Sequence, residues 1–395
     1  MLHEGSTGKI MLQIARAARE NSHEVRTFSP IGFAVRRKLS HPNIPGHTYY
    51  GSWLSRGVHV VLGVCVGANG LCSVLATGRL LRELDKFAPD VIHLHNLHQY
   101  CVNLPMLFRY IKKKNIKIVW TLHDCWTFTG HCPHFDYIGC EKWRTGCHNC
   151  PQLMGYPKSY VDNSKWMYKH KKKWFTGVKD MTIVTPSEWL AGLVKESFLR
   201  EYPVRVIHNG IDLSIFKPTP SEFREKYGIA DKYILLGVAF DWGERKGLDV
   251  FVELSKRLDP EKYQIVLVGT DESVDKQLPD CIISIHRTQN QKELAKIYSV
   301  ADLFVNPTRE EVLGLVNVES LACGTPVVTF KSGGSPECVD ETCGVAVGRD
   351  NVDAMERAIK EICENNPFIQ EKCILKARTF SMYDRFEEYV RLYEN

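Results

Sequence analysis

Two of the glutamates in residues 308–337, Glu311 and Glu319, stand out, with seven residues between them. An apolar run follows Gly314, which predicts that a loop holding the first glutamate leads into a buried helix holding the second. A carboxylate on a buried helix face is costly unless a charge or hydrogen bonds compensate it. Both glutamates are therefore candidates for binding a polar ligand.

The start of this predicted helix lies at Gly314, Leu315 and Val316. It offers unpaired N–H groups and the positive end of the helix dipole, which together favour a phosphate. A loop glutamate, an anion-binding helix start and a buried glutamate suit a nucleotide-linked sugar. The alternative interpretation is a surface glutamate pair beside an ordinary sheet-packing helix.

Two further sites carry candidate chemistry. Arg245 and Lys246 precede Gly247 at a predicted helix start, where a cation and the helix dipole can converge on a diphosphate. An exposed basic turn is the alternative there. His123 follows a predicted strand at 117–122, so it could hydrogen-bond a sugar hydroxyl or transfer a proton, although a lone histidine is more often structural.

These residues, with the stretches GTPVVTF and GGSPE that follow the glutamates, resemble the motif of the family 4 retaining glycosyltransferases. The resemblance covers nearly the whole chain and implies the GT-B fold, in which two Rossmann-like, doubly wound α/β domains face a central cleft. It implies that Glu311 contacts the transferred sugar, Glu319 binds the ribose and Lys246 binds the donor's phosphates. It also places His123 in the catalytic site and Thr288 in the loop that flanks the nucleotide base.

The implied reaction is retaining transfer of a hexose from a nucleotide-diphosphate sugar to a saccharide, expected to be lipid-linked, in polysaccharide biosynthesis. The sequence contains no Asp-x-Asp pair, so no catalytic metal is expected, and the helix dipole with basic side chains would stabilise the leaving group. One departure concerns the Gly-Arg pair often found upstream of the family's lysine, because Ala239 and Phe240 stand there. In our interpretation Arg245 supplies the missing charge.

A cysteine-rich loop spans residues 125–150. We expect no export signal, so the fourteen cysteines of the chain indicate free thiols or metal ligands rather than disulfides. Four thiolates closely spaced in a loop predict a structural zinc site. The candidate ligands are Cys132, Cys140, Cys147 and Cys150, with His131, His134 and His148 as possible substitutes. An iron–sulfur cluster and free thiols are the alternatives.

The charge is uneven along the chain. Residues 1–208 hold 28 Lys and Arg against 14 Asp and Glu, whereas the remainder holds 23 against 32. A basic first half indicates an anionic partner, such as a phospholipid surface or a polyprenyl-phosphate acceptor. The clusters Lys112–Lys114 and Lys171–Lys173 are either membrane contacts or solvated helix faces. Nucleic acid is not expected, since no binding module is recognisable.

The pattern predicts no membrane span, because glycines and an asparagine interrupt the most apolar window, residues 59–78. We therefore expect a cytoplasmic protein that can associate with the inner face of the membrane.

Alternating strands and helices predict a first domain at 1–208, a second at 209–380 and a C-terminal helix within 381–395 that packs back on the first domain. In the resembled family a strand precedes the glycine loop that opens this chain. That strand is missing here, which we interpret as a truncated gene product or a sheet that lacks this element. The predicted strands cover 23–28, 91–95, 117–122, 181–185 and 204–207 in the first domain and 233–239, 263–268, 281–285 and 302–305 in the second.

Three other functions compete with transfer. A nucleotide-sugar 2-epimerase of the same fold would share the donor site but would not need a basic acceptor domain. A degenerate, non-catalytic homologue would fit the missing strand but not the intact Glu311, Glu319, Lys246 and His123. A zinc-knuckle nucleic-acid binder would leave the second domain unexplained.

Overall fold

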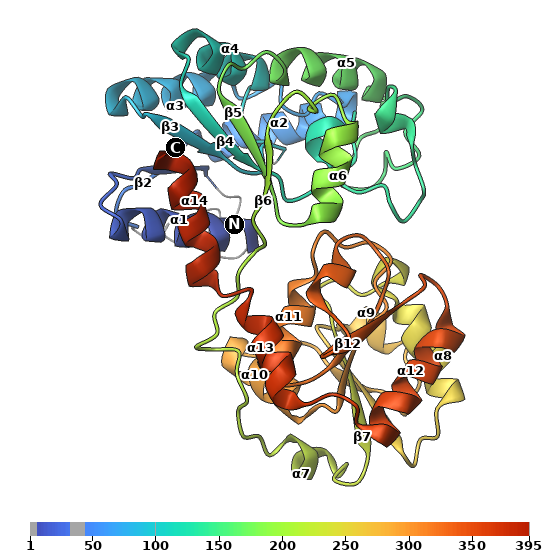
Figure 1. Ribbon diagram of the computed structural model, residues 1–395. Helices are drawn as coiled ribbons and strands as arrows, with labels where there is room; N and C mark the ends of the chain where they lie inside the picture. Colours follow the sequence, from blue (N-terminus) through green and yellow to red (C-terminus); the bar gives the residue numbers. More distant parts are fainter. Residues whose placement is uncertain (1–5, 32–43, 99, 395) are drawn as a thin grey trace. The chain divides into compact units, whose positions relative to one another are not determined.

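The computed structural model describes residues 6–31, 44–98 and 100–394. The chain forms two compact units (Figure 1). The first contains the described residues up to Ile207 together with those from Phe386 onward, and the second is continuous from His208 to Arg385. Each unit is α/β with parallel strands, as predicted.

The first unit has two parallel sheets. Its strands are β1 (Thr27–Pro30), β2 (His47–Tyr50), β3 (Val91–Leu94), β4 (Lys117–Thr121), β5 (Met181–Thr185) and β6 (Val204–Val206). β1 pairs with β2, and the other four follow one another in the order β3-β4-β5-β6. No described strand bridges β1 and β3.

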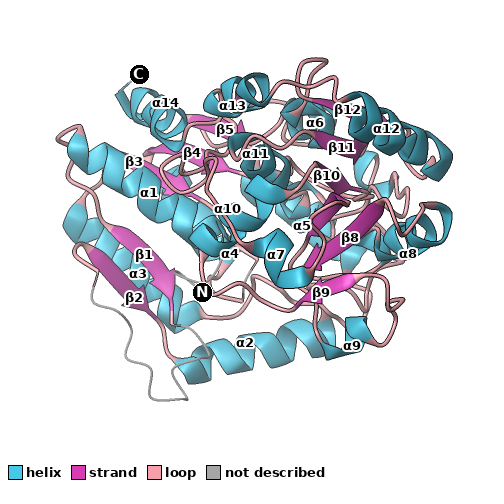
Figure 2. Ribbon diagram, turned by 90° about the horizontal axis from the view of Figure 1, so that it is seen from below, coloured by secondary structure: helices cyan, strands magenta, loops and turns pink. Residues whose placement is uncertain are grey.

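Helices pack around these strands (Figure 2). They are α1 (Ser6–Glu20), α2 (Trp53–Val66), α3 (Val74–Phe87), α4 (Leu104–Lys114), α5 (Ser164–Phe175), α6 (Glu188–Glu196) and most of α14 (Met382–Glu394), with the 3-10 turns η2 (Trp126–Phe128) and η3 (Lys142–Arg144). α4 shows why they form where they do. The Asn103 side chain accepts the Met106 N–H at its start, and Asn115 ends it in the left-handed conformation.

The second unit contains one six-stranded parallel sheet in the order β12-β11-β10-β7-β8-β9. Its strands are β7 (Tyr233–Val238), β8 (Tyr263–Val268), β9 (Ile283–Ile285), β10 (Leu303–Asn306), β11 (Val327–Phe330) and β12 (Gly344–Val347). The helices are α7 (Phe223–Tyr227), α8 (Leu248–Arg257), α9 (Glu272–Asp275), α10 (Gln291–Val300), α11 (Leu315–Ala322), α12 (Val352–Asn365) and α13 (Gln370–Arg378), with η4 (Glu244–Lys246) and η5 (Ser335–Cys338).

Both faces of the second sheet are covered. Ile234 and Phe304 pack on one side with α10 and α11, whereas Leu235 and Val305 pack on the other with α8 and α12. Every residue of β8, β10 and β11 is buried. This two-sided burial explains why these strands are mostly apolar, with a single polar residue in each: Gln264, Asn306 and Thr329.

Several expectations need correction. β1 begins at Thr27, not at residue 23, because residues 23–26 precede the ladder with β2. The helix α2 and the strand β2 were not predicted at all. Lys171 is fully buried, so it belongs to neither a membrane contact nor a solvated face. Across the described ranges, no helix combines the length and apolarity needed to span a bilayer.

Candidate functional site

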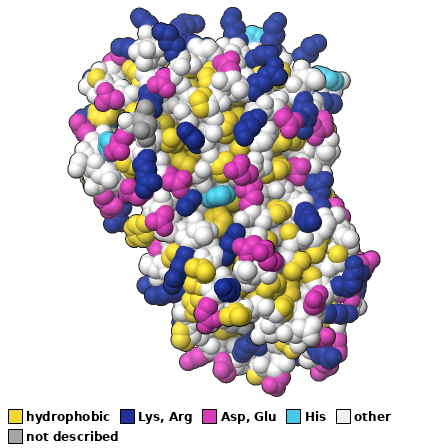
Figure 3. Space-filling view, viewed as in Figure 1, with side chains coloured by type: hydrophobic (Ala, Val, Ile, Leu, Met, Phe, Trp, Pro, Cys, Tyr) yellow, Lys and Arg dark blue, Asp and Glu magenta, His cyan; other side chains and the backbone are white. Residues whose placement is uncertain are grey.

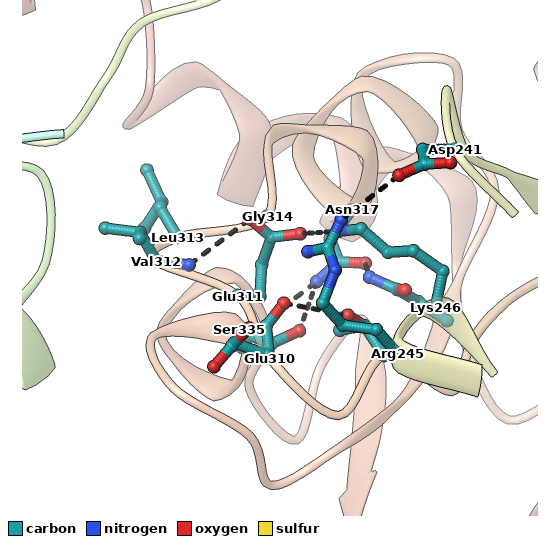
Figure 4. A network of polar contacts seen from close by, with 12 residues as sticks. Asp241, Arg245, Lys246, Glu310, Glu311, Val312, Leu313, Gly314, Asn317 and Ser335 are labelled. Carbon is teal, nitrogen blue, oxygen red and sulfur yellow. Dashed lines mark hydrogen bonds and ion pairs between the residues drawn. The ribbon is translucent and has the colours of Figure 1, made fainter. Parts of the chain in front are cut away.

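Lys246 and Glu311 form the centre of the site in the second unit (Figure 4). Lys246 ends η4, just before α8, and Glu311 lies in the loop between β10 and α11. Lys246 Nζ lies 2.6 Å from Glu311 Oε2, and the two side chains are 19% and 22% exposed. The sequence prediction named both residues, and the structure brings them together as a reachable, partly desolvated ion pair.

A glycine turn holds the backbone of Glu311. Gly334 N–H donates to Glu311 O at 3.1 Å. Gly333 has φ of +54°, and a Cβ added to it would lie 1.7 Å from that same carbonyl oxygen. Only glycine allows this approach, which explains the GGSPE turn that follows β11.

Arg309, which sequence reasoning missed, fixes the same loop from the other side. Its guanidinium pairs with both carboxylate oxygens of Asp249 at 2.7 Å and with Asp350 at 2.5 Å, and it also contacts Glu244 O. This fork joins the Glu311 loop to α8 and η4, where Lys246 lies. Its position two residues before Glu311 was the only signal in the sequence.

The start of α11 lies beside this pair. Gly314 caps the helix with φ of +88°, and Leu315 and Val316 form its partly exposed first turn. The first N–H groups of a helix have no partners within it, so this turn can bind an anion. Asn317, one residue further, is buried and donates to Ser335 Oγ at 2.9 Å.

Glu319 is only partly buried, which corrects the expectation of a buried carboxylate. Tyr298 donates its hydroxyl hydrogen to Glu319 Oε2 at 3.2 Å. The neighbouring Val318 is buried instead. The apolar face of α11 therefore points into the core at Val318 and does not include the adjacent glutamate.

The other two predicted donor-site residues, Arg245 and Thr288, do not take part in the Lys246–Glu311 ion pair. Arg245 Nη2 lies 4.0 Å from Asp241 Oδ2, and Figure 4 shows this contact beside the Lys246–Glu311 pair. Thr288 is partly exposed in the loop between β9 and α10.

In the first unit, His123 follows β4 and lies beside His95, which follows β3. His95 Nδ1 and His123 Nε2 are 3.1 Å apart, and the two rings stack. Burial lowers the pKa of His123 to about 4, with a smaller opposing effect of Asp124. Burial also lowers the pKa of His95 well below its usual value. His123 is therefore neutral at pH 7 and able to accept as well as donate a hydrogen bond.

Two family models match the chain. The model described as "Glycosyltransferase Family 4" matches residues 7–215, and "Glycosyl transferases group 1" matches residues 231–365. The chain belongs to glycosyltransferase family 4. It is a glycosyltransferase with the GT-B fold.

Curated relatives of this glycosyltransferase are also named as glycosyltransferases. It is 27% identical over 330 residues to the "Putative colanic acid biosynthesis glycosyl transferase WcaC" of Escherichia coli, covering 80% of this chain and 79% of that protein. It is 32% identical over 173 residues to a "GDP-mannose-dependent alpha-(1-6)-phosphatidylinositol monomannoside mannosyltransferase" of Mycolicibacterium smegmatis. This match covers 39% of this chain and 45% of that protein.

Solved structures support the fold of the glycosyltransferase. Sucrose-phosphate synthase from Thermosynechococcus elongatus matches with a TM-score of 0.72 and 18% identity, covering 99% of this chain and 93% of that one. Anabaena HepE in complex with UDP-glucose matches with a TM-score of 0.66 and 14% identity, covering 99% of this chain and 96% of that one. WaaG, "a glycosyltransferase involved in lipopolysaccharide biosynthesis", matches with a TM-score of 0.63 and 16% identity, covering 98% of this chain and 96% of that one.

The cysteine-rich loop of the glycosyltransferase follows His123 directly. All fourteen cysteines of the chain are free thiols. The Cys132 and Cys150 thiols hydrogen-bond to each other, and this bond lowers the pKa of Cys150 to about 7 while raising that of Cys132. Gly130 N–H donates to Cys147 Sγ at 3.1 Å. Cys140 lies near enough to affect the pKa of Cys132 electrostatically.

Within the described residues, no group of three or more His, Cys, Asp or Glu side chains is arranged to hold a metal ion. The loop is nevertheless tightly held. Lys171 is buried, donates to Thr129 O at 3.0 Å, and places Nζ 3.4 Å from the centre of the Trp126 ring. Burial lowers the pKa of Lys171 to about 7. The glycosyltransferase thus fixes the segment after His123 with a lysine inside the fold.

Proposed function

We propose that this glycosyltransferase moves a hexosyl group, with retention of configuration and without a metal, from a nucleotide-diphosphate sugar to a saccharide acceptor in polysaccharide biosynthesis. The observation that carries the donor half is the 2.6 Å pair of Lys246 and Glu311 beside the first turn of α11. The names of the relatives WcaC and WaaG support the polysaccharide pathway.

The residues around the Lys246–Glu311 pair have the following roles in this proposal. The diphosphate binds the N–H groups of α11 at Leu315 and Val316 and the ammonium of Lys246, which stabilise the charge that develops on the leaving group. Glu311, when Lys246 turns to the phosphate, accepts hydrogen bonds from hydroxyls of the transferred sugar. Glu319 accepts a hydrogen bond from the ribose.

We further propose that neutral His123 hydrogen-bonds the sugar or the acceptor, and that the leaving phosphate takes the acceptor's proton in a front-face displacement. The lowered pKa of His123 supports a neutral imidazole in this role.

A lipid-linked acceptor and contact with an anionic membrane are part of the same proposal. Helix α2 presents an exposed apolar stripe that includes Leu54, Val58 and Val61. Tyr160, also exposed, follows the exposed Lys158 in the segment that hydrogen-bonds to the end of α2. Lys and Arg side chains gather over α4 and α5 along the outer edge of the first unit (Figure 3). Apolar side chains with nearby cations favour a phospholipid surface.

A thermal-shift screen with UDP, GDP, ADP and CMP, and with their sugars, tests the donor site. A ligand that binds only the folded state raises the melting temperature, and more so the tighter it binds. One nucleotide diphosphate that stands out supports the proposal and identifies the base. The structural neighbour HepE, solved with UDP and with UDP-glucose, makes UDP the first candidate.

Product analysis then separates transfer from its rivals. A new glycosidic bond with the anomeric configuration of the donor supports retaining transfer. Conversion of the donor sugar without an acceptor would identify the 2-epimerase instead. Donor binding without either product would identify a non-catalytic homologue.

Zinc binding by the cysteine-rich loop is a separate proposal. The proximity of Cys132, Cys140, Cys147 and Cys150 supports it, because thiolates drawn together are the ligands that structural zinc prefers. Metal analysis of the purified protein should find about one zinc per chain. Well under one zinc, with four thiols titrating freely, would show that the loop holds free cysteines.

A further inference from the structure

A layer of polar side chains joins the last helix, α14, to His123. Successive residues of a strand point to opposite faces, so His93 and His95 point to one face of the sheet, as do Thr121 and His123. The two pairs meet on the same face, since His93 Nε2 lies 2.7 Å from Thr121 Oγ1 and His95 Nδ1 lies 3.1 Å from His123 Nε2. Helix α14 lies beside β3 and β4 (Figure 1 and Figure 2) and contacts this layer. The layer therefore runs from α14 to the carboxyl ends of the two strands.

Two tyrosines of α14 supply hydroxyl groups to this layer. The Tyr393 hydroxyl lies 2.7 Å from His93 Nδ1. Thr121 Oγ1, in turn, donates to the Tyr389 hydroxyl at 3.4 Å. The rings of Tyr389 and His93 also stack, with their centroids 5.3 Å apart. Since the two tyrosines are one helical turn apart, the same face of α14 engages both strands.

The directions of these bonds fix the tautomer of His93. The Thr121 hydroxyl has one hydrogen, and it gives that hydrogen to Tyr389. The Thr121 oxygen must therefore accept from His93, so His93 Nε2 carries a hydrogen. Burial lowers the pKa of His93 to about 3, with a smaller contribution from His123, so the ring is neutral at pH 7. His93 Nδ1 then has no hydrogen of its own and accepts one from the Tyr393 hydroxyl.

His95 connects His93 to His123. The His95 ring packs against both of the others, with centroids 4.2 Å from the His93 ring and 5.4 Å from the His123 ring. The His95 carbonyl oxygen accepts the Trp120 indole N–H at 3.2 Å, which holds the backbone at this point. His123 is partly exposed and its Nε2 faces His95, so Nδ1 is the nitrogen that it can offer to a sugar.

We propose that Tyr393 is a positioning residue that acts on His123 through the two histidine rings between them. A layer of hydrogen-bonding groups removed from water is costly unless each group is satisfied, whereas apolar side chains would pack under a helix without that requirement. The satisfied layer has one arrangement, and this arrangement defines where the His123 imidazole lies. The inference rests on the proposed role of His123, but the first test below does not.

The first test examines the histidine rings of the full, ligand-free chain by NMR. With nitrogen-15 in the histidines, the chemical shift of each ring nitrogen shows whether it carries a hydrogen, and His93→Gln and His123→Gln assign the signals. We expect hydrogen on His93 Nε2 alone in the wild-type protein. Tyr389→Phe removes the acceptor of the Thr121 hydrogen, which can then turn to His93. Both tautomers of His93 should therefore appear in this variant.

The second test removes only the hydroxyl that donates to His93. Tyr393→Phe should shift the ring signals of His123 and lower kcat about tenfold, which is less than the loss expected for His123→Gln. The donor KM should not change, because this hydroxyl is not part of the donor site. Turnover is measured with UDP-glucose, or with the sugar nucleotide that the thermal-shift screen selects in its place. Tyr383→Phe, at an exposed tyrosine of the same helix, is the matched control and should leave all three quantities unchanged.

A purely structural role of the layer would lower the melting temperature of Tyr393→Phe without moving the His123 signals, and this result would overturn the proposal. Shifted signals with wild-type kcat would overturn it as well. If Tyr393→Phe does not fold, Tyr389→Phe decides: two tautomers of His93 would support the proposal, and a single one would overturn it. Wild-type kcat in His123→Gln would instead reject the proposed role of His123, and the ring signals distinguish that failure from a failure of the network.

Discussion

Lys246 and Glu311, which are 65 positions apart in the sequence, hold their charged atoms 2.6 Å from each other. Each is partly removed from water, so each compensates the other's desolvation in the ligand-free protein. A diphosphate brings more negative charge than one carboxylate and can therefore draw the ammonium away. In our proposal, donor binding then leaves Glu311 available to the sugar.

Replacing Lys246 by methionine should weaken donor binding by about 2–3 kcal/mol, the usual worth of a hydrogen bond to a charged group. Isothermal titration with the nucleotide diphosphate measures the loss. Lys256→Met is the matched control, because Lys256 is an exposed lysine of α8. Equal affinity of the two variants would contradict the phosphate role.

Glu311→Ala should abolish transfer but keep the cooperative unfolding of the wild-type protein. The carboxylate is proposed to contact the sugar, whereas the loop backbone is held by Gly334 and Arg309. Turnover and a thermal melt on the same preparation provide the check. Wild-type turnover in this variant would remove Glu311 from the site.

His123→Gln should lower kcat by about 10²-fold or more if the imidazole takes part in the reaction. His95→Gln should lower kcat less and leave the donor KM unchanged, because His95 acts only by orienting His123 at 3.1 Å. His95→Asn, whose side-chain amide can replace Nδ1, should restore part of the loss. His170→Gln, on α5, serves as control, and equal kcat values for all four proteins would exclude a role for this pair.

Gly333→Ala should destabilise the second unit and reduce donor affinity together. The added Cβ would collide with Glu311 O, and the positive φ adds strain of about 1 kcal/mol or more. Gly192→Ala in α6 is the control, since its added methyl group meets nothing within 4 Å. Urea unfolding and nucleotide titration together test the prediction, and unchanged values in Gly333→Ala would refute it.

Stability should fall as the pH falls from 6.5 to about 4, in part through His59. Gly70 N–H donates to His59 Nε2, so Nδ1 carries the hydrogen and donates to Ser73 Oγ. Burial lowers the pKa of His59 to about 4. Between pH 6.5 and 4, His59 therefore binds a proton in the unfolded chain but not in the folded chain. The loss is about 1.4 kcal/mol per unit of pKa difference.

Urea unfolding at several pH values measures this slope. His59→Gln should flatten it, whereas His286→Gln, which removes an exposed imidazole paired with Asp275, should not. Parallel slopes for wild type and His59→Gln would show that His59 does not contribute.

Elements with strong local signals could be predicted from the sequence. The apolar, β-branched run of β8 has the predicted bounds, 263–268. α2 was not predicted, and Gly63 was used only as an argument against a membrane span. In the structure, a Cβ at Gly63 would lie 2.5 Å from the Tyr100 ring, so that glycine allows close packing and does not break the helix.

Site residues could be named, but their contacts could not. Lys246 and Glu311 were both expected at the donor, yet only the fold reveals that they pair with each other. Arg309 was missed, since its role depends on partners from distant elements. The burial of Glu319 was overestimated, because the apolar periodicity of a helix predicts where a side chain points only to within the width of one side chain.

The last helix, α14, predicts an unusual order of folding during synthesis. His93 in β3 bonds the Tyr393 hydroxyl at 2.7 Å, and Thr121 in β4 donates to the Tyr389 hydroxyl, so both strands contact residues made about 270–300 positions later. The second unit is continuous and can fold as soon as it leaves the ribosome. The first unit, although it is translated first, becomes complete only afterwards, which reverses the usual N-terminal-first order.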